Sequence, residues 1–286
     1  MLLKIEWAIN KKLVKLKSYN SFIWGGLSKV QELISIIVPV YNASSTIAKT
    51  IQTVLEQSYT HFELIVVDDY SKDDSFQILK ALEGKDQRII IYKNDQNLGV
   101  AQTRNYGISK ARGEFVAFLD SDDEWLEDKL ELQLRYMKEQ QAEICYTAYE
   151  MISEQGDTLA YCNVPMKVTY EELLKQNSIL CSSVLLKKSI LKDNPFSSKF
   201  FHEDFVLWLD LLKEGYKAIG IQRSLVRYKK GGRSSNKVLA AKNRWIIYRK
   251  SEGLGRISTI YYFIHYIING FRKYYIKVSN SNEIST

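Results

Sequence analysis

Short apolar runs alternate with amphipathic segments from residue 34 onward. The apolar runs are rich in Ile and Val, which is typical of buried parallel strands; they cover residues 34–40, 62–68, 88–92, 114–119 and 144–147. Between them, apolar residues recur at helical spacing, as in Ile47, Ile51, Val54 and Leu55. This spacing predicts helices at about 44–55, 71–82, 99–111 and 126–137. Such alternation predicts βαβ units, so we expect an α/β fold with a mainly parallel sheet and helices on both faces.

The first 33 residues mix apolar side chains with lysines. Ile5, Ile9 and Leu13 recur at helical spacing, which predicts a short basic amphipathic helix. The alternative is a helix packed on the main domain. The segment has neither an uninterrupted apolar region nor a small-residue cleavage site, which argues against a secretory signal.

The longest uncharged stretch is residues 257–271, with 15 residues rich in Tyr and Phe. A spanning helix needs roughly 20 mostly apolar residues, so this stretch is short for a transmembrane helix. Aromatic residues followed by Arg272 and Lys273 are typical of a helix that lies on a membrane surface. A buried C-terminal helix packed on the domain is the alternative.

Composition and charge narrow the possible partners. The 286 residues are 45% hydrophobic and 26% charged, which argues against disorder and against a polytopic membrane protein. The three cysteines are scattered and the three histidines isolated. This argues against a disulfide framework and against a structural zinc site. The net charge of +7 divides into +4 over residues 1–33, −9 over 34–222 and +12 over 223–286. This asymmetry predicts that the two ends contact an anionic partner or a membrane surface.

Carboxylates follow two of the predicted strands. Asp68 and Asp69 follow the second, and Asp120, Asp122 and Asp123 follow the fourth. The carboxyl ends of parallel strands meet at one edge of the sheet, where ligands bind. Gathered carboxylates repel one another unless a cation lies between them, and hard oxygen ligands favour Mg²⁺ or Mn²⁺ shared with phosphates. The alternative is that these acids cap helices, and we expect one residue of 122–124 to cap a helix that begins there.

Four ordered motifs carry a family resemblance. They are Ile36–Asn42, Val67–Ser71, Asn97–Asn105 and Leu119–Asp123. Together they resemble family-2 inverting glycosyltransferases of the GT-A fold (Rossmann-like), of the kind that builds bacterial cell-surface polysaccharide or lipooligosaccharide. The resemblance implies a GT-A domain (34–236). The charge and residue patterns described above add a basic amphipathic segment before it (1–33) and a basic, aromatic, helical, membrane-associating region after it (237–286). Within the domain, 34–125 would bind the nucleotide sugar and 126–236 the acceptor.

The resemblance also implies roles for single residues. The donor nucleotide would be bound by Pro39, Tyr41, Asp68, Asp69, Arg104, Asp120 and Arg227. The alternative for Arg104 is that it only pairs with Asp68 or Asp120. Asp122 would bind Mn²⁺ or Mg²⁺ between the two phosphates of the donor. Tyr70 departs from the family, which commonly has Gly in this turn. Because a positive φ is costly for Tyr, we expect a right-handed or bridge-like turn there.

The sequence His202-Glu203-Asp204 resembles the ED motif of the family, at the start of a predicted helix. We expect Asp204 to be the catalytic base and His202 to support it; the alternative is that the two acids only cap the helix. The basic stretch from Arg227 to Arg233 is interpreted as a lid that contacts the pyrophosphate, or as a solvated loop.

The expected partners are a nucleotide-sugar donor, most often UDP-linked in the family, and a lipid-linked or oligosaccharide acceptor. The expected setting is peripheral, at the cytoplasmic face of the inner membrane. A metal-dependent nucleotidyltransferase is the main alternative, although residues 40–45 lack the Gly-rich basic loop of that class. A nucleic-acid-binding protein is disfavoured by the acidic middle of the chain.

Overall fold

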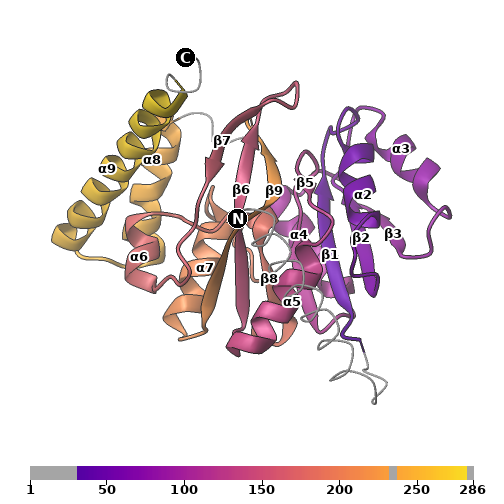
Figure 1. The fold of residues 1–286 in the computed structure, drawn as a ribbon, viewed down its shortest axis with the longest axis horizontal. Coiled ribbons are helices and arrows are strands. Elements are labelled where there is room, and N and C mark those ends of the chain that lie inside the picture. The colour runs from indigo at the N-terminus through magenta and orange to yellow at the C-terminus, as the bar shows by residue number, and fades with distance from the viewer. Residues whose placement is uncertain (1–30, 232–236, 282–286) are drawn as a thin grey trace, which may run out of the picture. The chain divides into compact units, whose positions relative to one another are not determined.

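The computed structural model describes residues 31–231 and 237–281, with side chains through residue 270. The described part contains a nine-stranded sheet in the order β3-β2-β1-β4-β8-β6-β9-β5, with β7 paired to β6 (Figure 1). Most of the predicted amphipathic segment 1–33 lies outside the described residues.

The first four strands form the parallel half of the sheet, as the sequence predicts. They are β1 (Ile34–Val40), β2 (Phe62–Asp68), β3 (Ile89–Lys93) and β4 (Phe115–Phe118). Successive side chains of a strand point to opposite faces. Ile37 accordingly packs in one buried cluster, while Ile36 and Val38 pack in the other.

Helices cover both faces of the sheet. The cluster that contains Ile36 also receives α2 (Ile47–Leu55), α3 (Ser75–Leu82) and α5 (Lys129–Gln140). The cluster that contains Ile37 receives α4 (Val100–Lys110), α6 (Tyr170–Lys175) and α7 (Glu203–Lys213). The α/β fold with helices on both faces is confirmed.

The second half of the sheet is mixed rather than parallel. Its strands are β5 (Glu124–Trp125), β6 (Ile144–Ile152), β7 (Thr158–Cys162), β8 (Leu185–Lys187) and β9 (Ala218–Lys229). The short β8 lies antiparallel between β4 and β6, whereas β6 and β9 are parallel. The parallel half therefore ends at β4, and β8 joins it to the mixed half.

The predicted helix start at residues 122–124 is wrong. Glu124 and Trp125 form β5, which pairs with β9, and α5 begins only at Lys129. Asp123 is fully buried; its carboxylate accepts hydrogen bonds from Ser182 Oγ at 2.5 Å and from the backbone N of Lys229 at 3.0 Å. This acid fastens the loop after β4 to the end of β9 instead of capping a helix.

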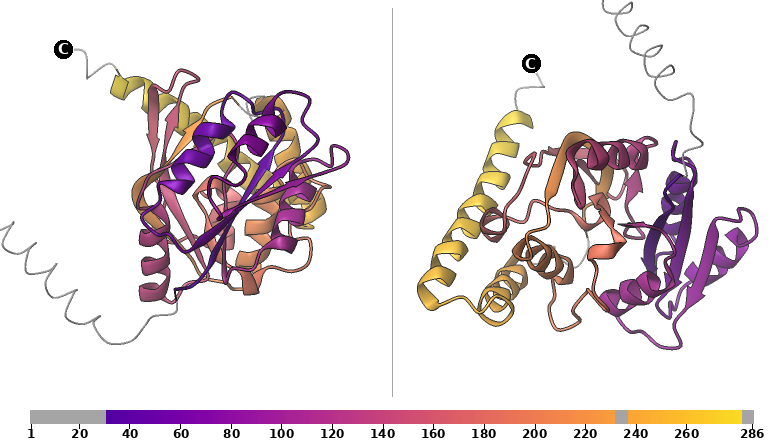
Figure 2. Two further views of the ribbon diagram at one scale, coloured as in Figure 1. Left: turned by 90° about the vertical axis from the view of Figure 1, so that its right-hand side faces the viewer. Right: turned by 90° about the horizontal axis from the view of Figure 1, so that it is seen from below.

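The C-terminal region is helical, as predicted. It contains α8 (Lys237–Ile246), a π-helical turn (Ile247–Ser251) and α9 (Arg256–Ser281). Figure 2 shows α9 on the outside of this region, beside α8 and α6, and α9 contacts both. Within residues 31–231 and 237–281, we find no helix whose apolar length matches the thickness of a bilayer.

Candidate active site

A cavity of about 490 Å³ lies at the carboxyl edge of the parallel strands. Its wall includes most of the predicted site residues: Pro39, Tyr41, Asp69, Arg104, Asp120, Asp122 and Asp204. Asp68 and Arg227 are not among the residues that line it. In an open α/β sheet with this strand order, the ends of β1 and β4 form the crevice in which ligands bind. The predicted location of the site therefore agrees with the cavity.

Asp69 forms the rigid wall at one end of the cavity. Its carboxylate accepts hydrogen bonds from Asn94 Nδ2 at 2.8 Å and from the backbone N of Leu98 and Gly99 at 2.8 and 2.9 Å. The neighbouring Asp68 is fully buried and accepts from the backbone N of Ser71 at 3.2 Å. Asp68 thus shapes the turn after β2, and Asp69 faces the ligand space.

The turn after Asp69 contradicts one expectation. Tyr70 has φ = 63°, in the left-handed region, where we expected a right-handed or bridge-like turn. A non-glycine residue pays about 1–2 kcal/mol for this conformation. The Tyr70 ring is 38% exposed, and Lys72 Nζ lies 3.4 Å from its centroid. The exposed ring adds no burial cost, so the turn carries only the backbone cost of the left-handed conformation.

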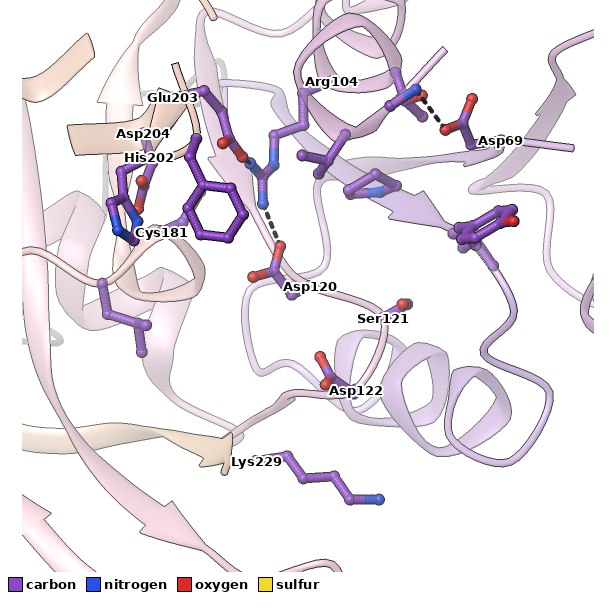
Figure 3. Close-up of a pocket in the computed structure, with 18 of the residues that line it drawn as sticks. Asp69, Arg104, Asp120, Ser121, Asp122, Cys181, His202, Glu203, Asp204 and Lys229 are labelled. Atoms are coloured by element: carbon purple, nitrogen blue, oxygen red, sulfur yellow. Dashed lines mark hydrogen bonds and ion pairs between the residues drawn. The ribbon is translucent and has the colours of Figure 1, made fainter. Parts of the chain in front are cut away.

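Arg104 connects the two halves of the cavity. Its side chain is 3% exposed, and its guanidinium donates to Asp120 Oδ1 at 2.5 Å and to Glu203 Oε1 at 2.7 Å (Figure 3). Asp120 belongs to the loop after β4, and Glu203 begins α7. Charged groups removed from water need close partners, and Arg104 supplies one to each carboxylate. The bridge holds the loop after β4 and the start of α7 in one arrangement.

Asp120 and Asp122 present carboxylates to the cavity, with Lys229 beside Asp122 (Figure 3). Burial and the negative charge of Asp120 raise the pKa of Asp122. A divalent cation would offset both effects, because it attracts the ionised carboxylate. Among the described residues, no three His, Cys, Asp or Glu side chains gather into a cage. A site of one or two carboxylates suits Mg²⁺ or Mn²⁺, which share their coordination with substrate phosphates and water.

Asp204 lies in the first turn of α7, on the wall opposite Asp69. One of its carboxylate oxygens, Oδ1, accepts a hydrogen bond from the backbone N of Phe205 at 2.8 Å. Burial, together with the charge of Glu203, raises the pKa of Asp204 to about 6, while Arg104 opposes the rise. A carboxylate with a pKa close to neutral pH is suited to accept a proton.

The structure places Arg227 away from the cavity. Its guanidinium donates to the Gly156 carbonyl at 3.2 Å and lies 3.4 and 3.5 Å from the carboxylates of Glu124 and Glu150. Lys229, at the end of β9, lines the cavity instead. The other arginine of the predicted lid, Arg233, lies outside the described residues.

Sequence reasoning missed what three residues contribute to this site. Glu203 holds Arg104, Asn94 holds Asp69, and Lys229 contributes a cation to the wall. Asn94 follows β3 directly, so its position at a strand end was a signal of the kind that singled out Asp69. The partnership between Glu203 and Arg104 joins residues 99 apart in the chain and leaves no local signal.

Comparison with known proteins decides the family. Residues 35–191, more than half of the chain, match the family model described as "Glycosyl transferase family 2". The chain belongs to glycosyl transferase family 2. This assignment favours the glycosyltransferase prediction over the nucleotidyltransferase alternative.

Relatives within glycosyl transferase family 2 share most of the chain. One is the Escherichia coli protein named UDP-Glc:alpha-D-GlcNAc-diphosphoundecaprenol beta-1,3-glucosyltransferase WfgD, which is 38% identical over 255 residues, covering 88% of this chain and 98% of WfgD.

Solved structures show the same fold. The S. aureus TarS 1–349 complex with UDP-GlcNAc has a TM-score of 0.63 and 20% identity, covering 82% of this chain and 71% of TarS 1–349. The Pyrobaculum calidifontis mannosyltransferase PcManGT, in complex with GDP-Man and Mn²⁺, has a TM-score of 0.64 and 16% identity. The match covers 87% of this chain and 73% of the PcManGT chain.

Proposed function

We propose that this enzyme transfers a hexose or hexosamine from a UDP-linked donor, with inversion, onto a lipid-linked glycan of a bacterial surface polysaccharide. The observation that carries the proposal is the arrangement around Arg104. One buried guanidinium holds Asp120, beside the candidate metal carboxylate Asp122, and Glu203, beside the candidate base Asp204. The candidate metal ligand and the candidate base therefore line one cavity, each beside a carboxylate held by the same guanidinium.

The donor would lie along the edge formed by β1, β2 and β4. Pro39, Tyr41 and Asp69 line the cavity where the base would fit, and Asp120 would lie on the ribose side. Bound Mn²⁺ or Mg²⁺, held by Asp122, would neutralise the charge that develops on the departing diphosphate. Lys229 is placed to add a second positive charge there, which is the role the sequence assigned to Arg227.

The transfer step breaks the bond between the anomeric carbon and the diphosphate and forms a bond to the acceptor oxygen. Asp204 takes the proton of that acceptor hydroxyl as the new bond forms on the opposite face of the sugar. The electron pair of the broken bond leaves with UDP. Arg104 fixes Asp120 and Glu203 so that this in-line geometry is present before the acceptor arrives.

The relative WfgD carries a diphosphoundecaprenol-linked sugar acceptor in its name, and it covers 88% of this chain. A lipid-linked acceptor places the reaction at a membrane surface, and the exposed basic residues of the C-terminal region favour contact with anionic lipid. We therefore assign the enzyme to a peripheral position at the cytoplasmic face of the inner membrane.

The direct test is transfer from a panel of nucleotide sugars, with Mn²⁺, onto a GlcNAc-diphospholipid analogue. We expect UDP release and a lengthened acceptor with one UDP-sugar, and NMR of the product reports whether the anomeric configuration is inverted. Asp122→Asn and Asp204→Asn should each lose transfer by at least a hundredfold. Asp74→Asn, an exposed acid outside the cavity, is the matched control. Transfer that survives in either cavity variant would contradict the assigned roles.

A further inference from the structure

The outer face of α9 carries a row of exposed apolar side chains. Six large side chains, each 40–86% exposed, recur at helical spacing along it: Ile257, Ile260, Tyr261, Ile264, Ile267 and Ile268. We call this set the α9 stripe. Isolated exposed apolar residues are ordinary, but a contiguous set of this size on one helix marks an interaction surface.

Charge around the α9 stripe restricts what covers it. In residues 237–281 the sole acidic residue is Glu252, whose side chain is fully buried and pairs with Lys213 at 2.5 Å. Exposed positive charges flank the start of the stripe at Arg249, Lys250 and Arg256. A second copy of the same face would bring like charges together. Exposed Glu171 and Glu172 lie on the adjoining α6, so it is the described part of α8 and α9 that is complementary to an anionic surface.

The dimensions of the α9 stripe fit a helix lying along a membrane. From Ile257 to Ile268 the stripe is about 17 Å long, since each helical residue rises about 1.5 Å. Trp245 of α8 is 37% exposed and stacks edge-on against Phe263 of α9, with ring centroids 5.2 Å apart. Amphipathic rings beside an apolar face and basic residues are typical of helices in the headgroup region.

The opposite face of α9 is attached firmly to the domain. Thr259 is fully buried, and Asn269 Nδ2 donates to the Lys175 carbonyl of α6 at 3.4 Å. The guanidinium of Arg244, from α8, lies 3.5 Å from the centroid of the Phe205 ring and 5.1 Å from that of Tyr266. Phe205 follows Asp204 on α7, so a partner bound to α9 is oriented relative to the catalytic helix.

We propose that the α9 stripe is the surface by which this enzyme docks on a bilayer containing anionic phospholipid. The stripe enters the headgroup region lengthwise, while Arg249, Lys250 and Arg256 meet lipid phosphates. The proposal names the membrane partner of the proposed function, and it rests on that function only for the lipid-linked nature of the acceptor.

Flotation of the full chain with vesicles tests this docking. The variant is Ile260→Gln/Ile264→Gln, and the matched control is Leu159→Gln/Met166→Gln, which changes two equally exposed apolar residues outside α9. On vesicles of phosphatidylcholine with 30% phosphatidylglycerol, we expect the α9 variant to partition at least tenfold more weakly than the wild type. The control variant should partition as strongly as the wild type. Wild-type protein should bind pure phosphatidylcholine vesicles more weakly than the mixture.

Two results would overturn the proposal. One is equal flotation of the α9 variant and the wild type. The other is a dimer, measured by light scattering, that the α9 variant converts to a monomer without loss of vesicle binding, which would assign the stripe to a second copy. Donor turnover with a water-soluble acceptor, measured on the same samples, should be unchanged in the α9 variant. If the wild type lacks transfer but still floats, the proposed function fails and the docking surface stands.

Discussion

Replacing Asp204 by Asn should make the protein more stable while it removes transfer. The pKa of this buried carboxyl is raised from 3.8 to about 6, so ionising it inside the protein costs free energy. Asn has the same shape, carries no charge, and keeps an oxygen that accepts the hydrogen bond from the backbone N of Phe205. The substitution therefore removes the cost of the charge and little else.

The magnitude and sign follow from proton linkage. A shift of about two pKa units, at 1.36 kcal/mol per unit, corresponds to about 3 kcal/mol, and we expect 1–3 because Glu203 shares the effect. Between pH 3.8 and 6 the carboxyl of Asp204 is more protonated in the native state of the wild type than in the unfolded state. Wild-type stability therefore falls as pH rises through that window, and the full cost is present above pH 6.

Urea unfolding of wild type and Asp204→Asn between pH 5 and pH 8 measures the difference. The variant should gain stability over the wild type as pH rises to about 6.5, with a constant gain above that. Other titrating groups cancel because both proteins contain them. A gain that does not change with pH, or a variant less stable than wild type at pH 7, would refute the assigned pKa. In the same buffers, wild-type kcat/KM should fall on the acid side of about pH 6.

Three further outcomes test other parts of the structure. Arg104→Met should lower the free energy of unfolding by about 3–5 kcal/mol, because the buried carboxylate of Glu203 and that of Asp120 lose the cation that balances their charge. A loss below 1 kcal/mol in urea unfolding would contradict the bridge. Asp122→Asn should raise the Mn²⁺ concentration needed for donor binding at least tenfold, and an unchanged calorimetric titration would remove Asp122 from the metal site. Lys129 is fully buried, and burial lowers its pKa to about 7. The unfolded state therefore binds the Lys129 proton more readily than the native state does. Lys129→Met should stabilise the protein by a few kcal/mol at pH 7, and this gain should shrink toward pH 10. A gain in stability that grows with pH would contradict the lowered pKa.

The sequence predicted the parallel half of the fold well because its signals are local. The runs that became β1 and β2 are continuous and rich in Ile and Val, and each is followed by an amphipathic helix. The second half depends on distant pairing. The three residues of β8 form a strand because β4 and β6 pair with them on either side. So short a segment has no hydrophobic pattern of its own that predicts a strand.

In the candidate site too, the residues with local signals were predicted and those that depend on distant pairing were not. Asp69, Asp120 and Asp122 follow strands, so topology alone brings them to one edge. Arg227 was expected at the pyrophosphate, but its register neighbours on β5 and β6 are Glu124 and Glu150, which hold it elsewhere. Cross-strand partners of this kind are set by the sheet, and a motif in the sequence does not reveal them.

The bridge through Arg104 also bears on how acceptor specificity is exchanged between relatives. Arg104 and Asp120 belong to the proposed donor half of the chain (34–125), whereas Glu203 belongs to the proposed acceptor half (126–236). A chimera that joins this donor half to the acceptor half of another family member inherits one side of the bridge from each parent. Such a chimera is expected to fold around a working cavity only when the incoming half supplies a carboxylate at the position of Glu203, whatever acceptor its remaining residues select.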